Sequence, residues 1–208
     1  MTTIGFIGSG NIGGTVARLA TAAGYDVVVS NSRGPETLKD LVDELGPRAR
    51  AATAAEAAAA GEIVVVSVPF HAHPQLPVAE LAGKVVLDTN NYYPQRDGNF
   101  AALDEGKLTS AELEQRHLGT AQVVKVFNNI FSGHLASLPR PAGAADRSAL
   151  PIAGDDASAK ATATAFLDAI GYDAVDVGSL ADSWRFEPGQ PVYGPPYGNY
   201  GEPAATPA

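Results

Sequence analysis

The amino-acid sequence predicts an open, doubly wound α/β sheet, because short apolar strands alternate with helix-length segments along most of its 208 residues. Hydrophobic residues make up 45% of the chain and charged residues 18%, which is enough apolar material for a sizeable core. A glycine-rich turn follows the first of these strands directly. We therefore expect a mostly parallel sheet of about eight strands with helices on both faces.

The strands are located by short apolar runs. The run at residues 63–68 is the most apolar in the chain, as expected of a strand buried on both faces of a parallel sheet. The others are expected at residues 3–7, 27–30, 84–88, 122–127, 150–153 and 174–177.

Helices are expected between these strands. Apolar residues recur at helical spacing from Ile12 to Ala20, and Gly24 ends that segment. A second helix is expected from Gly34-Pro35 to Gly46, and a later one over residues 157–170. Thr53 and Thr109 each precede a glutamate by three residues, the pattern of a capping box at a helix start.

The last part of the chain has a different composition. From Phe186 on, Pro, Gly and Tyr dominate, which excludes a helix or a central strand. We therefore divide the chain into a main domain, residues 1–180, and a C-terminal arm, residues 181–208. The arm is either a frayed tail or an ordered segment that covers a partner subunit or the ligand crevice. Its aromatic residues favour order between Phe186 and Tyr200, and from Gly201 on we expect disorder.

Charge and cysteine content exclude several classes of function. The chain has 14 Lys and Arg against 23 Asp and Glu, a formal net charge of −9, which argues against nucleic-acid or anionic membrane surfaces. It contains no cysteine, which excludes disulfides and thiolate metal sites. No basic leader or membrane-length apolar run is present, so we expect a cytoplasmic protein.

The glycine-rich turn has the spacing of a dinucleotide-binding fingerprint, G-x-G-x-x-G between a strand and a helix. Gly8 permits the tight turn, Gly10 lets the backbone approach a pyrophosphate, and Gly13 allows close packing of helix and strand. The helix N-terminus offers unpaired N–H groups to the phosphates. This predicts a Rossmann-type fold in which the cofactor is bound by Gly8, Ser9, Gly10, Asn11, Ile12 and Gly13.

The end of the second strand indicates which nucleotide is bound. An NAD-selective site carries Asp or Glu there for the ribose hydroxyl, whereas this chain has Ser30-Asn31-Ser32-Arg33. Arg33 can form a fork to a 2′-phosphate or stack on adenine, and Asn31 and Ser32 can donate hydrogen bonds. We therefore predict NADP(H), although Arg33 could also be a solvated loop cation.

The reacting end of the site is expected where the later strands end, because ligands of such sheets lie beyond the carboxyl ends of the strands. The residues there are mostly amides, hydroxyls and aromatics, which suit a neutral carboxamide and a flat heteroaromatic partner better than a small carboxylate, and so favour a planar substrate. Candidates for positioning the reactants are Pro69, Phe70, His71 and Asn128, with Val68 and Asn90 also touching the cofactor.

Two further features of this region allow more than one interpretation. His71-Ala72-His73 invites a metal site, but the chain has only four histidines, so we expect no metal and a histidine lining the pocket. Lys125 could be a buried catalytic lysine, although a solvent-facing lysine at a strand end is the more common case.

Taken in order, several motifs resemble the coenzyme F420-dependent NADP oxidoreductase family. They are residues 8–13, Asn31-Ser32-Arg33, Val68-Pro69, residues 125–130 and residues 154–156. The resemblance covers residues 1 to 180. It implies a homodimer that transfers a hydride between NADP(H) and the deazaflavin F420 as co-substrate. By motif matching, it places Ser9, Ser32 and Arg33 at the 2′-phosphate end, Pro69 and Phe70 at the nicotinamide, and Asn128 where F420 stacks.

Two other functions stay open at this point. An NADPH-dependent imine or carbonyl reductase would use the same cofactor, but the related enzymes carry a long helical dimerisation domain, and only residues 181–208 follow the main domain here. A non-catalytic NADP(H)-binding protein would bind the nucleotide without turnover.

Overall fold

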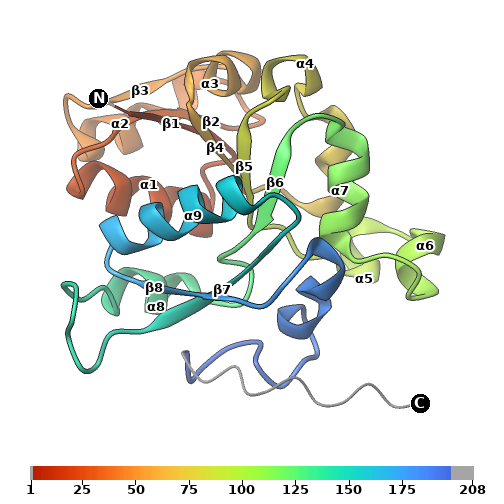
Figure 1. Ribbon diagram of the computed structural model, residues 1–208. Coiled ribbons are helices and arrows are strands. Elements are labelled where there is room, and N and C mark those ends of the chain that lie inside the picture. Colours follow the sequence, from red (N-terminus) through yellow and green to blue (C-terminus); the bar gives the residue numbers. More distant parts are fainter. Residues whose placement is uncertain (1, 198–208) are drawn as a thin grey trace.

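A computed structural model describes residues 2–197 of the chain (Figure 1). These residues form one eight-stranded sheet in the order β3-β2-β1-β4-β5-β6-β7-β8. All neighbouring strands are parallel except β6 and β7, which confirms the predicted doubly wound fold. The strands are β1 (Thr3–Ile7), β2 (Asp26–Ser30), β3 (Ala49–Ala51), β4 (Ile63–Val66), β5 (Val85–Asp88), β6 (Gln122–Lys125), β7 (Ala149–Gly154) and β8 (Asp173–Asp176).

Helices cover both faces of this sheet. On one face, apolar side chains of α1 (Asn11–Ala22), α2 (Lys39–Leu45), α8 (Ser132–Ser137) and α9 (Ala157–Ala169) share a core with the strands, and Figure 1 shows α1 and α9 across that face. On the other face lie α3 (Ala54–Ala60), α4 (Val78–Leu81) and α7 (Ser110–Leu118). The remaining helical turns are α5 (Pro94–Asp97), α6 (Ala101–Asp104), η1 (Pro35–Leu38), η2 (Phe70–Gln75) and η3 (Leu180–Phe186).

Local sequence patterns predicted the positions of most of these helices and strands. Both predicted capping boxes are formed, with Thr53 and Thr109 each accepting from the backbone N–H three residues on. The helix expected from Gly34-Pro35 begins as η1 and continues as α2. Strand β3 was not located, because its three residues carry no apolar run.

Strands β4 and β6 are each two residues shorter than their apolar runs predict. Beyond these strand ends, Ser67, Val68 and Phe127 line a cavity. Val126 and Phe127 are fully buried, so their hydrophobicity reflects burial rather than strand pairing.

The described part of the arm folds back on its own main domain. Phe186 is fully buried, and the backbone N–H of Gly194 donates to the Asn129 carbonyl at 3.0 Å. The Tyr197 hydroxyl meets the Phe131 N–H at 3.2 Å and His134 Nδ1 at 3.0 Å. Tyr200 and the segment from Gly201 on, for which we expected disorder, lie outside the described residues. In residues 2–197 we find no helix long and apolar enough to cross a membrane.

Candidate nucleotide and substrate site

The three glycines of the fingerprint have two kinds of environment. At Gly8, where φ is +96°, an added Cβ would lie 2.1 Å from the Ser67 carbonyl oxygen. At Gly13 it would lie 2.1 Å from the Gly8 carbonyl oxygen, so these two positions are closed by the protein itself. At Gly10 a Cβ would meet nothing within 4 Å. Gly10 therefore faces open space, as a backbone that must approach a phosphate requires.

The start of α1 is free to bind an anion. Gly10 is its N-cap and provides no side-chain cap, and the first turn contains no acidic residue. The first N–H groups of the helix consequently keep their hydrogen-bonding capacity and the positive end of the helix dipole. Ser9 donates its hydroxyl to the Ser30 carbonyl at 2.8 Å, which ties this turn to the end of β2. The residues present thus fit a dinucleotide pyrophosphate.

The loop after β2 presents a free cation. The side chain of Asn31 shapes the loop itself, because it donates to Thr37 Oγ1 at 2.8 Å and accepts from the Arg33 N–H at 3.0 Å. Ser32 and Arg33 are exposed, and within the described part of the chain their side chains have no hydrogen-bond or ionic partner. No carboxylate occupies positions 30–33. This end of the site suits a phosphate better than a bare ribose hydroxyl.

Two cavities meet at the carboxyl ends of β1 and β4. The nucleotide-side cavity, about 500 Å³, contains the glycine turn and the loop with Arg33. The substrate-side cavity, about 540 Å³, is reached by the loops after β5 and β6 and by the arm. Both cavities are lined by Gly10, Ser67, Val68 and Pro69, so they are two halves of one crevice. Val68, Pro69, Asn90 and Asn128, predicted from separate strand ends, therefore do converge.

Asn128 is placed by an unusual backbone. Phe127, just before it, has φ of +64°, the only positive φ of a non-glycine in the described residues, and its side chain is fully buried. Such a conformation costs about 1–2 kcal/mol and persists only where the surroundings impose it. Asn128 Nδ2 then donates to the Phe186 carbonyl at 2.9 Å and to Asn91 Oδ1 at 3.2 Å. Asn128 therefore joins the arm to the loop after β5.

Lys125 corrects one expectation. It does not face solvent but is fully buried, and Nζ lies 2.9 Å from Asp88 Oδ2. Nζ also donates to the Asn90 carbonyl and to Ser110 Oγ, the latter at 3.0 Å. Ser110 Oγ in turn donates to Glu187 Oε1 at 2.6 Å. Lys125 lines neither cavity, so its role is to hold the loop after β5 and the start of the arm from beneath.

A second buried carboxyl group, missed in the sequence, belongs to this network. Glu114 of α7 is fully buried and accepts from Asn90 Nδ2 at 2.9 Å, while its Oε1 has no partner in residues 2–197. Burial raises the pKa of Glu114 to about 8, and the neighbouring negative charge of Asp88 acts in the same direction. Asn90 is thus clamped, because its Oδ1 also accepts from the Val68 N–H at 2.9 Å.

The segment after Pro69 differs from our expectation. Phe70, which we expected at the nicotinamide, is fully buried and lines neither cavity. It packs on His73 and Phe100, with ring centroids 4.8 and 5.3 Å apart. His73 is buried too, and its Nδ1 contacts the Phe70 carbonyl at 2.9 Å. His71 lines only the nucleotide-side cavity, away from the reacting end where we expected it.

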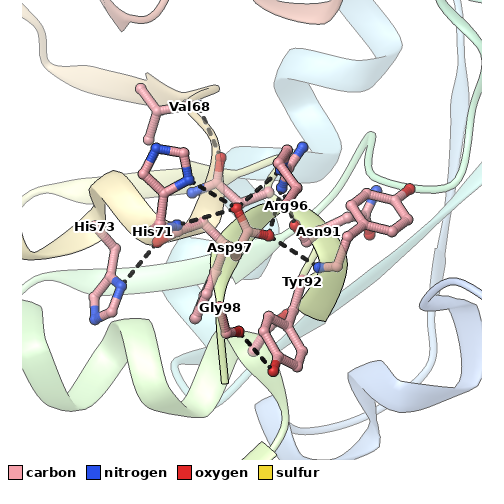
Figure 2. A network of polar contacts seen from close by, with 12 residues as sticks. Val68, His71, His73, Asn91, Tyr92, Arg96, Asp97 and Gly98 are labelled. Atoms are coloured by element: carbon pink, nitrogen blue, oxygen red, sulfur yellow. Dashed lines mark hydrogen bonds and ion pairs between the residues drawn. The ribbon is translucent and has the colours of Figure 1, made fainter. Parts of the chain in front are cut away.

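Asp97 organises the loop between these histidines and the substrate-side cavity (Figure 2). Its side chain is fully buried and accepts from Arg96, from the Tyr93 N–H at 2.9 Å, and from His71 Nδ1 at 3.0 Å. Burial alone would raise the pKa of Asp97, but these donors hold it well below its usual range. Within the described chain, no group of three or more metal-ligating side chains occurs, and His71 pairs with Asp97 instead.

The arm supplies one wall of the substrate-side cavity. Tyr193 lines it, and its hydroxyl lies 2.7 Å from the Tyr93 hydroxyl and 3.4 Å from Asn91 Nδ2. Burial raises the pKa of Tyr193 above its usual range, and the hydrogen bond to Tyr93 adds to this effect. The arm is therefore part of the site.

Comparison with known proteins agrees with this geometry. Residues 3–92 match the family described as NADP oxidoreductase, coenzyme F420-dependent. These residues contain the glycine turn, the Arg33 loop and Val68-Pro69. Over these residues, which are less than half of the chain, the protein is similar to this family of NADP oxidoreductases.

Three relatives extend the comparison. The structure of protein SMa0349 from Sinorhizobium meliloti is 29% identical, with a TM-score of 0.78 over 92% of this chain and 93% of that one. A protein of Arthrobacter sp. FB24, assigned by name to the F420-dependent NADP reductases, is 25% identical, with a TM-score of 0.74 over 89% and 88%. Metalloreductase STEAP3 of Rattus norvegicus is 30% identical over 187 residues, 88% of this chain, but the chain spans only 35% of that protein.

Proposed function

We propose that this protein transfers a hydride between NADP(H) and a deazaflavin of the F420 type. The observation that carries the proposal is the family match over residues 3–92, which covers the nucleotide half of the crevice. The substrate half supports it, because amides and aromatic rings line a cavity of about 540 Å³ open to a flat acceptor.

Each part of the chain has a task in this proposal. The N–H groups at the start of α1 bind the pyrophosphate, and Arg33 with Ser32 binds the 2′-phosphate. Val68 and Pro69, where the two cavities meet, position the nicotinamide. NADPH, when bound, supplies the hydride from its nicotinamide ring.

The remaining residues have to align the two rings and exclude water. Donor and acceptor carbons need a separation of about 3–3.5 Å, so alignment supplies much of the rate. The clamped Asn90 and Asn128 set the cavity walls on one side, and Tyr193 sets the other. Reduction of the deazaflavin takes up the hydride plus one proton, and we assign that proton to solvent, since His71 lies in the other half of the crevice.

Two organisational predictions also become proposals. We propose that residues 1–180 form the catalytic domain and that residues 181–208 are an arm that completes the substrate cavity. We also propose a homodimer, which light scattering at micromolar concentration would test.

The activity test mixes the protein with NADPH and oxidised F420 and follows the loss of deazaflavin absorbance. Parallel reactions contain FMN, a small cyclic imine, or ferric citrate, the last because the rat relative is named a metalloreductase. We expect F420 to be reduced faster than the other acceptors, and NADPH to be preferred over NADH. Turnover of the imine or of ferric citrate with F420 left oxidised would refute the proposal. Nucleotide binding without any turnover would make the protein a non-catalytic NADP(H) binder.

A further inference from the structure

We propose that Arg96 forms an oxyanion-binding subsite in the substrate-side cavity, which takes a phosphate or carboxylate group of the second substrate. The inference rests on the proposed function only for the identity of the molecule that carries this group. Arg96 lies in α5, beyond the residues that match the family model.

Arg96 is the one charged side chain among the described residues that line this cavity. The neighbouring amides of Asn91 and Asn128 are already engaged with the protein. Asn91 Nδ2 donates to the Asn128 carbonyl at 2.8 Å, and Asn128 Nδ2 donates to Phe186 and Asn91. The N–H groups at the start of α1 also border this cavity, but the proposed function assigns them to the pyrophosphate. A further negatively charged group would therefore depend on Arg96 to offset its lost hydration.

Three contacts fix the guanidinium of Arg96 (Figure 2). Nε donates to Asp97 Oδ1 at 2.8 Å, while Nη2 donates to Asp97 Oδ2 at 2.8 Å and to the Asn91 carbonyl at 2.7 Å. The guanidinium carbon lies 4.9 Å from the centroid of the Tyr93 ring. Because Asp97 is itself held by Tyr93 and His71, the orientation of Arg96 is set before any ligand arrives.

The remaining nitrogen, Nη1, shows that Arg96 can bind a ligand as well as hold the surrounding loop in place. Bracing uses Nε and Nη2, whereas Nη1 has no hydrogen-bond partner within residues 2–197. Its two N–H groups remain available on a side chain that is 43% exposed and lines the cavity. Two free N–H donors on a charged group suit an oxyanion.

The experiment compares two deazaflavins with the same ring. Protein saturated with NADP⁺ is titrated with oxidised F420, whose side chain carries a phosphodiester and carboxylates, and with the same ring bearing only a neutral ribityl chain. Deazaflavin fluorescence reports binding. We expect Arg96→Met to weaken F420 binding at least tenfold and binding of the neutral compound less than twofold. As a control, Arg50→Met removes the same charge at an exposed position of the edge strand β3. It should leave the binding of both deazaflavins unchanged.

Equal weakening of both deazaflavins by Arg96→Met would overturn the proposal, because it would show that Arg96 only braces the loop. If neither compound binds the wild-type protein, the F420 assignment fails and the subsite is tested with inorganic pyrophosphate. Calorimetry at saturating NADP⁺ should then show pyrophosphate binding to the wild type and to Arg50→Met but not to Arg96→Met. No binding to the wild type, or equal binding to all three, would refute the subsite.

Discussion

The buried carboxyl group of Glu114 should make the stability of the protein depend on pH in an unusual direction. We consider its replacement by glutamine, which keeps the shape and leaves an oxygen to accept from Asn90 Nδ2. The substitution removes the ability to ionise beside Asp88. Because Glu114 is fully buried, hydration cannot screen the effect.

The sign follows from the raised pKa. Between the ordinary pKa of 4.5 and the raised value of about 8, the folded protein holds a proton on Glu114 that the unfolded chain has lost. The stabilisation is therefore complete below the lower value and is lost as the pH rises toward the upper one. Each pH unit inside this window is worth up to about 1.4 kcal/mol, so the free energy of unfolding should fall by about 2–3 kcal/mol between pH 5.5 and 7.5 through this group.

Urea unfolding at a series of pH values measures this dependence. We expect the curve of Glu114→Gln to be flatter than that of the wild type by this amount, with the variant relatively more stable at high pH. Glu80→Gln, the same change at a partly exposed position on α4, serves as the control and should run parallel to the wild type. Parallel curves for wild type and Glu114→Gln would refute the reasoning, because they would show that Glu114 has the same proton affinity in both states.

Three predictions concern the crevice. Arg33→Ala should weaken NADPH binding by about one to two decades, the worth of a charge-assisted contact of about 1.5–3 kcal/mol, and leave NADH binding unchanged in a fluorescence titration; equal losses would mean that Arg33 does not bind the 2′-phosphate. Gly10→Val should abolish NADPH binding with the melting temperature kept, whereas Gly13→Ala should lower the melting temperature, because only the second side chain meets protein atoms; a folding defect in Gly10→Val would contradict this. Truncation after Gln190 removes Tyr193 and should raise the Michaelis constant for the non-nicotinamide substrate without changing NADPH affinity; an unchanged Michaelis constant would exclude the arm from the site.

The glycine turn could be predicted because its requirements are local. A tight turn, space for a phosphate next to the backbone, and a close contact between helix and strand each require a glycine at one position. Gly8, Gly10 and Gly13 stand at these three positions. The capping boxes are equally local, which is why the starts of α3 and α7 were found. Contacts between different elements of the fold were harder to predict.

Lys125 and Phe70 show why. Lys125 is buried because β5 and β6 pair with Asp88 directly opposite it, a register that a single strand does not reveal. The available signal was an acidic residue at the end of one apolar run and a lysine inside the next. Phe70 is withdrawn from the site by Phe100, thirty residues away in the sequence, which closes over it together with His73. Arg96 and Asp97 lie in the four-residue helix α5, which is too short to show a helical period in the sequence.

The buried network also explains how the arm and the crevice can act together. Lys125 holds the Asn90 carbonyl on one side and, through Ser110, the Glu187 carboxylate at the start of the arm on the other. A movement of the arm that breaks the contact between Glu187 and Ser110 would leave the Ser110 hydroxyl, which accepts from Lys125, without an acceptor of its own, at a cost that rises with burial. Because the Asn90 carbonyl accepts from the same lysine, such a movement would also displace the cavity wall at Asn90. The arm and the loop after β5 are therefore expected to shift as one unit when the second substrate enters.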